Sequence, residues 1–141
     1  MKIDEAIKKV GSIPYLAVPG GMDLKEVAGK LLTMRQIRGI YVVDEQERLQ
    51  GVISLGLLIS RSLEDKIKPT FHARSLLERI TADKAVDIME SRVISARTDD
   101  DIQTVLDRMI RNDIKEIPVI DEGRKIVGNL GIIDLWKLTE R

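Results

Sequence analysis

The chain has 141 residues, of which 43% are hydrophobic and 33% are charged, and its 23 Lys and Arg residues balance its 23 Asp and Glu residues. This composition excludes a disordered chain and fits a single soluble globular domain. A net charge of zero gives no basic surface for nucleic acid or anionic lipid, and the absence of cysteine excludes disulfides and thiolate chemistry.

No segment has the character of a membrane span or a signal peptide. The longest apolar stretch, residues 52–59, is too short to cross a bilayer, and the first residues are charged. We therefore expect a cytoplasmic protein that binds no nucleic acid and does not insert into membranes. The sequence fits both a free-standing protein and an excised regulatory domain of a larger one.

The central part of the chain occurs twice. Residues 39–45, GIYVVDE, are matched by residues 116–122, EIPVIDE, and the glycine at 51 is matched by the glycine at 128, both with an offset of 77. This offset exceeds the periods of solenoid and propeller repeats and indicates a duplicated half-domain. Two related copies imply pseudo-twofold symmetry and favour ligand sites in the clefts between them.

The first copy opens with a short helical pattern at residues 4–7, for which Asp4 is the expected N-cap. Residues 13–18 are rich enough in β-branched side chains for a strand. An amphipathic helix follows, with Asp23 at its start, because apolar side chains recur at helical spacing at positions 24, 27, 28, 31 and 32.

Two strands and a helix complete the first copy. Residues 40–43 form a short apolar strand, and the polar residues 45–48 connect it to a second strand, which predicts a hairpin. Residues 55–62 are expected to form a closing helix, with Ser54 as an ordinary N-cap. The expected unit is strand, helix, strand, strand and helix, preceded by a short helix.

The second copy begins in the same way. Asp83 matches Asp4 as the expected N-cap of an opening helix, and residues 92–96 match the first strand. Asp100 or Asp101 is expected to start the amphipathic helix, whose apolar side chains lie at positions 102, 105, 106, 109 and 110.

The second copy also closes with a hairpin and a helix. Residues 117–120 form its first apolar strand, and residues 132–139 form its closing helix. Trp136, in that helix, is expected in the core or at a dimer contact.

A segment without a counterpart separates the copies. Residues 68–70, Lys-Pro-Thr, break the chain, and residues 73–80 suit a short linker helix. His72, the single histidine, is expected to be a solvated or capping residue. The expected organisation is a first motif at residues 1–62, a linker at 63–82 and a second motif at 83–141.

The repeated pattern resembles a CBS (cystathionine β-synthase) domain pair, also called a Bateman module. The runs that carry the resemblance are residues 87–89, residues 114–121 and residues 128–135. The resemblance implies an α/β (α+β) fold of two tandem CBS motifs, each β-α-β-β-α with a preceding short helix, packed with pseudo-twofold symmetry. It also implies a regulatory module that binds AMP, ADP, ATP or S-adenosylmethionine, pairs into a homodimer and controls a linked or partner protein.

The family's nucleotide motif is divided between the two copies. That motif places a Ser or Thr hydroxyl at the start of the closing helix, where phosphate is favoured, and an Asp one turn later for the ribose hydroxyls. The first copy keeps Ser54 but has Leu57 in place of the Asp. The second copy keeps Asp134 but has Gly131 in place of the hydroxyl.

The Asp134 site is the expected one, because ribose recognition needs a specific acceptor whereas backbone N–H groups can hold phosphate. The resemblance implies a nucleotide site made of Asp134, Gly131, Ser95, Ala96, Arg97, Ile117 and Pro118. Within it, Arg97 is the expected phosphate partner, and Ile117 and Pro118 are expected to face the base. A possible second site, more apolar, consists of Ser54, Ala17, Val18, Ile40 and Tyr41.

Each of these residues also has a structural explanation. Asp134 lies in the first turn of a helix, where an acidic residue is favourable. Arg97 is also suited to a surface ion pair with the carboxylates at residues 99–101, and those carboxylates fit a helix start better than a metal site.

Two functions follow, and a third is excluded. The chain is either an adenosyl-ligand sensor or a ligand-free dimerisation or docking scaffold with degenerate nucleotide sites. An enzyme is not expected, because one histidine and no cysteine leave no convincing catalytic pair.

Overall fold

The computed structural model describes residues 1–34, 39–67 and 84–140, including their side chains except those of residues 64–67. The chain divides into two compact units. Unit 1 consists of Met1–Pro14, Glu47–Leu49 and Ile94–Arg141, and unit 2 consists of Tyr15–Gln46 and Gln50–Val93. His72, Asp83 and the helix expected at residues 73–80 lie outside the described residues.

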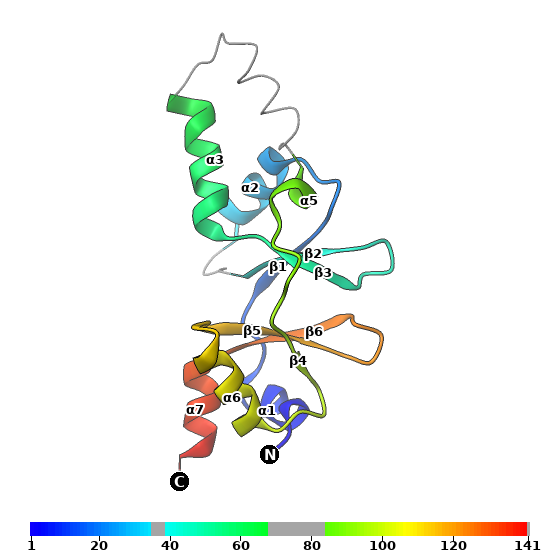
Figure 1. Cartoon of the computed structure of the whole chain (residues 1–141), viewed down its shortest axis with the longest axis vertical. Helices are drawn as coiled ribbons and strands as arrows, with labels where there is room; N and C mark the ends of the chain where they lie inside the picture. Colours follow the sequence, from blue (N-terminus) through cyan, green and yellow to red (C-terminus); the bar gives the residue numbers. More distant parts are fainter. Residues whose placement is uncertain (35–38, 68–83, 141) are drawn as a thin grey trace. The chain divides into compact units, whose positions relative to one another are not determined.

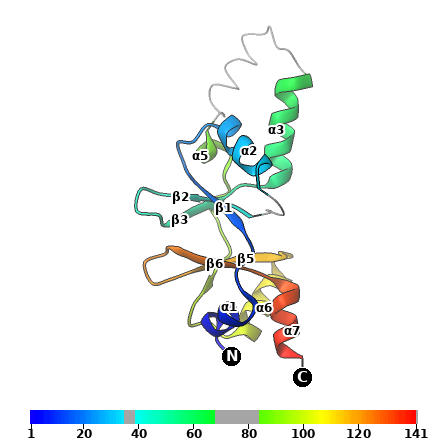
Figure 2. The ribbon, with the colours of Figure 1, turned by 180° about the vertical axis from the view of Figure 1, so that it is seen from behind.

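The sheet of unit 2 has the strand order β1-β2-β3. It comprises β1 (Tyr15–Pro19), β2 (Gly39–Val43) and β3 (Leu49–Val52). β1 runs parallel to β2 over its whole length, from Tyr15 opposite Gly39 to Pro19 opposite Val43. The helices α2 (Leu24–Leu32), α3 (Leu55–Ile67) and α5 (Ala85–Ile88) lie on one side of this sheet (Figures 1 and 2).

Unit 1 repeats this arrangement with the strand order β4-β5-β6. It comprises β4 (Ala96–Arg97), β5 (Glu116–Ile120) and β6 (Ile126–Gly131), and β4 is parallel and β6 antiparallel to β5. The helices α1 (Ile3–Val10), α6 (Ile102–Arg111) and α7 (Ile132–Thr139) lie on one side of the sheet (Figure 1). The fold is therefore mixed α and β, with two small three-stranded sheets of the same topology.

The two short opening helices are exchanged between the copies. Unit 1, which holds the strands of the second copy, contains the helix that precedes the first copy, and unit 2 contains the helix that precedes the second copy. α1 precedes the first copy, but it packs in unit 1, where Ile3 and Ala6 are buried with side chains of α6, β5 and β6. The Ile3 N–H donates to the Asp100 carbonyl (2.9 Å), and the Asp4 N–H donates to the Thr98 carbonyl (3.0 Å). The start of α1 is thus bonded to the loop that joins β4 to α6.

α5 makes the equivalent contacts in unit 2. The Ala85 N–H donates to the Met22 carbonyl (2.9 Å), and the Val86 N–H donates to the Gly20 carbonyl (2.9 Å). Met22 and Gly20 of the first copy are equivalent to Asp100 and Thr98 of the second copy. Because the bonds are the same in both copies, Ala85 is the counterpart of Ile3. The sequence match of Asp4 with Asp83 was therefore displaced by three residues.

The predicted helix starts hold for α2 and α6 but not for α1. The Asp23 side chain accepts from the Lys25 N–H (2.8 Å), and the Asp101 side chain accepts from the Gln103 N–H (3.1 Å). Asp4 is not an N-cap, because α1 begins at Ile3 after Lys2, and the Asp4 carboxylate accepts from the Glu5 N–H within the first turn (2.9 Å). The backbone bond from Ile3 to Asp100 fixes this earlier start.

The repeated Asp closes the turn of each hairpin. The Asp44 carboxylate accepts from the Gln46 N–H (2.9 Å), and the Asp121 carboxylate accepts from the Lys125 N–H (3.0 Å). Asp is favoured in turns because its short side chain bonds to nearby backbone N–H groups. The strongest part of the repeat therefore has a structural role, and the predicted hairpins are confirmed.

The strand expected at residues 92–96 is reduced to Ala96–Arg97 because of a proline in β5. The Asn129 N–H and carbonyl bond to Ser12 and Ile13, on the side of β6 that faces away from β5. Pro118 of β5 pairs with Asn129, so the backbone groups of Pro118 also point away from the hairpin partner, toward β4. Proline has no N–H to donate to a parallel neighbour, and the pairing of β4 with β5 begins only at Val119. Tyr41 occupies the same position in β2, and there the pairing is complete.

Three predicted apolar positions are exposed. Leu32 is 85% exposed, Ile110 is 68% exposed and Trp136 is 58% exposed, although helical spacing placed the first two on a buried face. Trp136 is therefore not a core residue. Other side chains in the last turns of these helices, such as Met109 and Leu31, still pack against the cores, so these three positions lie at the edge of the buried faces.

Some element bounds also differ from the prediction. α3 continues to Ile67 rather than ending at residue 62, and β1 begins at Tyr15 rather than at residue 13. Ile13 is displaced from β1 because its N–H donates to the Asn129 carbonyl of β6 (2.8 Å). No helix within the described ranges combines the length and apolar character that a membrane crossing requires.

Ile3→Ala should lower the free energy of unfolding by about 2–5 kcal/mol, because Ile3 is fully buried in the core of unit 1. Urea denaturation followed by circular dichroism measures this change. Leu32→Ala, at an exposed position, is the matched control and should change stability by less than about 0.5 kcal/mol. Equal effects of the two variants would show that α1 does not belong to the core.

Candidate functional site

The start of α7 presents an acidic side chain that has no partner in the described part of the chain. Gly131 ends β6 and is the N-cap of α7, where it offers no side-chain acceptor, and the Ile132 N–H donates to the Lys115 carbonyl (2.8 Å). Asp134 lies in the first turn and is half-buried. Within the described ranges, no group forms a hydrogen bond or an ion pair with the Asp134 carboxylate.

The space beside Gly131 is narrow. A Cβ atom built on Gly131 would lie 2.9 Å from Ile13 Cδ1, 3.6 Å from Asp134 Oδ2 and 3.9 Å from the Lys115 carbonyl oxygen. The first of these separations is too short for a real side chain, so a Ser or Thr at this position requires Ile13 to move. Because Cδ1 is the far end of a flexible side chain, this shift is easily made, and packing alone does not account for the missing hydroxyl of the family motif.

A polar network lies opposite Gly131. Glu116 of β5 pairs with Gly131 of β6, and its Oε1 accepts from the Asn129 side-chain amide (2.8 Å). Asn129 is fully buried, and its backbone N–H donates to Ser12 Oγ (2.9 Å). Glu116 is half-buried, and its carboxylate is held by the Asn129 amide.

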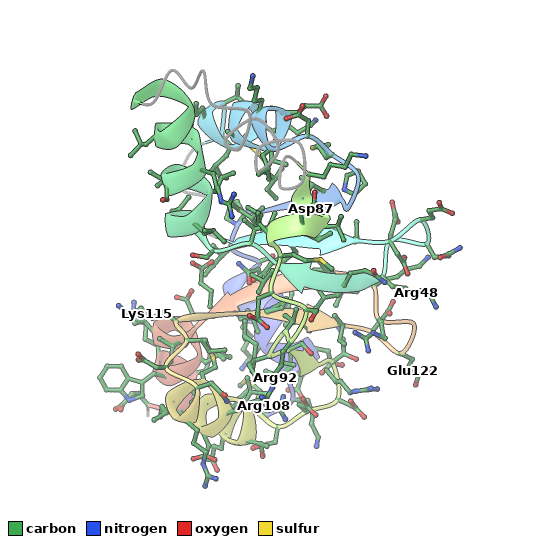
Figure 3. All side chains as sticks on the ribbon, turned by 45° about the horizontal axis from the view of Figure 1, so that its top comes forward. Arg48, Asp87, Arg92, Arg108, Lys115 and Glu122 are labelled. Atoms are coloured by element: carbon green, nitrogen blue, oxygen red, sulfur yellow. The ribbon has the colours of Figure 1, made fainter. Side chains whose placement is uncertain are left out.

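Lys115, Glu116 and Ile13 are neighbours of Asp134 that sequence reasoning missed. Lys115 is exposed, and Figure 3 shows its side chain near the start of α7. Hairpin pairing could have placed Lys115 and Glu116 opposite Gly131, because both directly precede the predicted strand. Nothing in the sequence indicates Ile13, whose position depends on the backbone bond to Asn129.

The other predicted residues of this site lie farther along the sheet. Ala96 pairs with Val119 and Arg97 with Ile120, whereas Gly131 pairs with Glu116 at the opposite end of β5. At about 3.3 Å per residue, the two ends are roughly 13 Å apart. The register therefore divides the predicted residues into one group with Asp134 and Gly131 and another with Ser95, Ala96 and Arg97.

The predicted base-facing pair lies between these groups, on two faces of the sheet. The Ile117 side chain is buried in the helix-covered core of unit 1 together with that of Ala96. Pro118 is buried but lies on the other face, because side chains alternate along a strand. Glu116 shares the face of Pro118.

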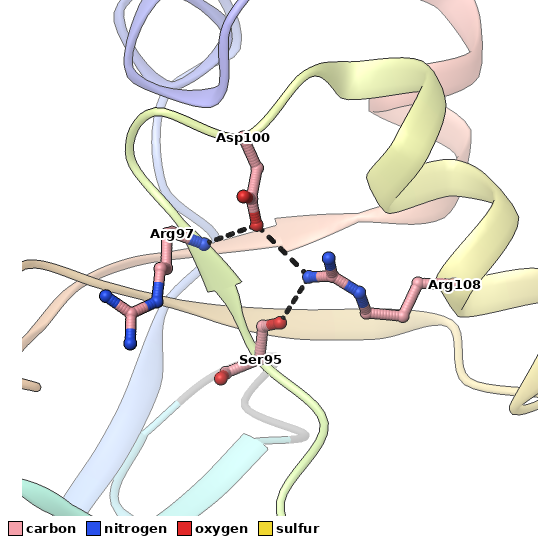
Figure 4. A network of polar contacts seen from close by, with 4 residues as sticks. All are labelled: Ser95, Arg97, Asp100 and Arg108. Atoms are coloured by element: carbon pink, nitrogen blue, oxygen red, sulfur yellow. Dashed lines mark hydrogen bonds and ion pairs between the residues drawn. The ribbon is translucent and has the colours of Figure 1, made fainter.

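Arg108, a residue not anticipated from the sequence, fixes the backbone around β4. Its Nη1 donates to the Ser95 carbonyl (2.7 Å) and to Asp100 Oδ2 (3.1 Å), and the same carboxylate oxygen accepts from the Arg97 N–H (2.9 Å). Figure 4 shows that the Arg97 guanidinium lies on the opposite side of β4 from Arg108. Asp100 thus pairs with Arg108, and the Arg97 side chain is exposed without an ion pair to a described carboxylate.

The possible second site, in unit 2, lacks the charged groups of the first. Ser54 Oγ accepts from the Leu57 N–H (3.3 Å), which confirms Ser54 as a cap of α3. Val18 and Ile40 are buried in the core of unit 2, Ala17 is exposed, and the Tyr41 ring contacts the Tyr15 ring at 5.7 Å between centroids. The register also places Pro19 at the position of Arg97, so this site has neither the carboxylate nor the cation.

The described residues contain no cluster of His, Asp and Glu side chains suited to a metal ion. Asp100 and Asp101 are engaged by Arg108 and by the start of α6, as a helix-start role requires.

Several curated proteins match the chain over most of its length. A magnesium transporter, MgtE, from Thermus thermophilus is 32% identical over 130 residues, which cover 89% of this chain and 25% of the transporter. The chain thus spans about a quarter of the length of this relative.

Solved structures share the fold. The cytosolic domain of the Mg²⁺ channel MgtE in complex with ATP has a TM-score of 0.69 and 32% identity, covering 88% of this chain and 44% of that one. A CBS domain pair in complex with 5′-methylthioadenosine and S-adenosylmethionine has a TM-score of 0.69 and 22% identity, covering 99% of this chain and 95% of that one.

A family model decides the assignment. The CBS domain model matches residues 7–64 and residues 85–135, one match for each copy of the repeat. Together with the duplicated sheet topology, these two matches show that the chain belongs to the CBS domain family as a tandem pair.

Proposed function

We propose that the chain is a non-catalytic regulatory module that binds an adenosyl nucleotide beside Asp134 and thereby controls a partner protein. The observation that carries this proposal is the half-buried Asp134 carboxylate, which has no partner among the described residues. A carboxylate in this state accepts hydrogen bonds from both hydroxyls of a ribose, and each bond to a charged group contributes about 1.5–3 kcal/mol before desolvation.

The remaining parts of the ligand have suitable neighbours in unit 1. Backbone N–H groups at the start of α7 suit an anionic group, and Gly131 leaves them accessible. The proposal places the base beside Pro118, which is buried on the sheet face of Glu116. The backbone of Ser95 and Ala96, with the exposed Arg97, extends the site along β4. Ile117 contributes through its backbone, since its side chain is in the core.

The relatives support regulation of a larger protein. The chain corresponds to about a quarter of MgtE from Thermus thermophilus, and the cytosolic domain of an MgtE channel has been solved with ATP. In this proposal the module lies in the cytoplasm and acts on an attached or separate partner. A ligand shifts such a partner only if it binds one arrangement of the module more tightly than another.

Asp134→Ala should strongly reduce ligand-induced stabilisation. A ligand at a hundred times its dissociation constant adds about 2.7 kcal/mol to the folded state, which raises Tm by about 5–15 °C in a chain of this size. Differential scanning fluorimetry with AMP, ADP, ATP, S-adenosylmethionine and 5′-methylthioadenosine measures the shift, and calorimetry should give an affinity about 10- to 100-fold lower for the variant.

Asp107→Ala is the matched control for this experiment. Asp107 is an exposed carboxylate of α6 in the same unit, where it pairs with Arg111, so its removal should leave ligand binding unchanged. If no adenosyl ligand raises the Tm of the unmodified protein, or if both variants lose binding equally, the proposal fails.

A ligand-free dimerisation scaffold is the second candidate, and exposed apolar side chains favour it. Ile110, Ile133 and Trp136 are exposed on α6 and α7, which pack against each other. Leu32 and Ile59 are exposed at the positions of Ile110 and Trp136 in the other copy. Because the same positions are exposed in both copies, a second copy of the chain with matching helices is the proposed occupant.

Trp136→Ser should convert such a homodimer to monomers. Loss of a large aromatic contact at an interface typically costs at least about 2 kcal/mol, or roughly a 30-fold increase in the dissociation constant. Sedimentation velocity across a concentration series measures the change, and Val86→Ser, at an exposed position on α5, is the control. A monomeric unmodified protein, or a dimer unaffected by Trp136→Ser, would contradict this interface.

A further inference from the structure

The Tyr41 side chain leans along β2 toward Gly39. A Cβ atom built on Gly39 would lie 3.0 Å from Tyr41 Oη and 3.1 Å from both Cε2 and Cζ of the same ring. The two residues are two positions apart in the strand and therefore share a face of the sheet. The outer end of the ring thus covers Gly39, and a side chain at position 39 would require the ring to shift.

A second ring supports this arrangement. Tyr15 of β1 pairs with Gly39, and its ring contacts the Tyr41 ring at a centroid distance of 5.7 Å and an interplanar angle of 55°. Tilted aromatic pairs of this kind are favourable beyond the area that they bury. Tyr41 is 3% exposed, and burial raises the pKa of the Tyr15 hydroxyl. The Tyr41 ring is therefore withdrawn from water and held over Gly39.

The covered glycine lies at the start of the closing helix of unit 2. The Ile53 N–H donates to the Ile40 carbonyl (2.8 Å), which makes these two residues a pair across the hairpin. The next pair is therefore Gly39 and Ser54, and Ser54 caps α3. The ring that covers Gly39 consequently lies beside the start of α3.

The neighbouring positions of the first copy correspond to ligand positions of the second. Tyr41 stands where the second copy has Pro118, beside which the proposed function places the base. The Ser54 hydroxyl is engaged in capping α3, where it accepts from the Leu57 N–H (3.3 Å). Leu57, at the position of Asp134, offers no side-chain acceptor to a ribose. Of the parts of a nucleotide, the flat ring alone therefore has a counterpart here, and the chain itself supplies it.

We infer that the Tyr41 ring is a built-in occupant of the first copy's site, so that the module takes one adenosyl ligand per chain, at the Asp134 site. The first copy is held in its occupied state by the protein itself. The number of ligands rests on the proposed function, whereas the occupancy by Tyr41 does not, because it concerns the other copy.

The test removes the ring and supplies a free one. Tyr41→Ala should leave a ring-sized apolar space beside Tyr15, and such spaces bind small aromatic molecules. Adenine is the probe for a base, and p-cresol, which reproduces the deleted side chain, is the positive control for the space. In differential scanning fluorimetry, both probes should raise the Tm of Tyr41→Ala by about 3–8 °C at about ten times their dissociation constants.

Tyr41→Phe is the matched control, because it keeps the ring and should show no such shift with either probe. Nuclear magnetic resonance should give Overhauser contacts between adenine and the Tyr15 ring in Tyr41→Ala and not in Tyr41→Phe, which places the probe where the ring was. Native mass spectrometry of the unmodified protein with ATP or S-adenosylmethionine should show one ligand per chain.

The possible results are distinct. Stabilisation of Tyr41→Ala by p-cresol alone would overturn the inference, because the space would then fit the side chain and not a base. Stabilisation by neither probe, a variant that does not fold with either probe, or two ligands per unmodified chain would overturn it as well. If no adenosyl ligand binds the unmodified protein, the proposed function fails, and the response of Tyr41→Ala to adenine still decides the role of the ring.

Discussion

The backbone bonds between each short helix and the other copy's loop are the constraint on which the rest of the structure depends. α1 begins where its N–H groups meet the carbonyls of Thr98 and Asp100, and α5 begins where its N–H groups meet those of Gly20 and Met22. These bonds satisfy donors that a helix start leaves unpaired. They also bring Ile3 and Ala6 into a core that otherwise comes from residues 94–140.

The same crossing of the chain builds the candidate site. After α1, residues 11–13 run along the outer edge of β6, where Ser12 and Ile13 bond to the Asn129 backbone. That edge position brings Ile13 against Gly131. It leaves the Pro118 backbone directed toward β4, and the missing N–H of the proline shortens β4. The asymmetry between the two copies therefore follows from a few side chains on a shared backbone plan. A proline replaces Tyr41, and an asparagine replaces Val52.

Most of the secondary structure could be predicted from the sequence, because it depends on local patterns that occur twice. The hairpins follow from apolar runs around a turn with Asp44 or Asp121, and the starts of α2 and α6 follow from a capping aspartate. The expected N-cap of α1, Asp4, was wrong by two residues, because a bond to a distant carbonyl fixes a start at Ile3 after Lys2. The exposure of Leu32 and Ile110 was also unpredictable, since helical spacing says which side chains share a face but not how far a neighbour covers it.

The candidate site was predictable only in part. Asp134 and Gly131 were identified from a motif, and the structure places both at the start of α7. Lys115 and Glu116 enter through strand register, and Ile13 enters through a bond between segments more than a hundred positions apart in the chain. Arg108 was missed because a single arginine within an amphipathic helix has no pattern that distinguishes it from a solvated one.

The exchange of short helices also governs the order in which the protein is completed during synthesis. Residues 1–14 belong to unit 1, but the strands and helices that cover α1 lie at residues 94–140 and emerge from the ribosome after unit 2. α1 has only eight residues, too few to be stable alone in water. The nascent chain must therefore keep Ile3 and Ala6 exposed until residues 94–140 have been made. The contacts that bury them carry the high loop-closure cost of a long sequence separation. Unit 2 has its residues in 15–46 and 50–93 and is complete first, so the ordered part of a growing chain begins in its middle rather than at its N-terminus.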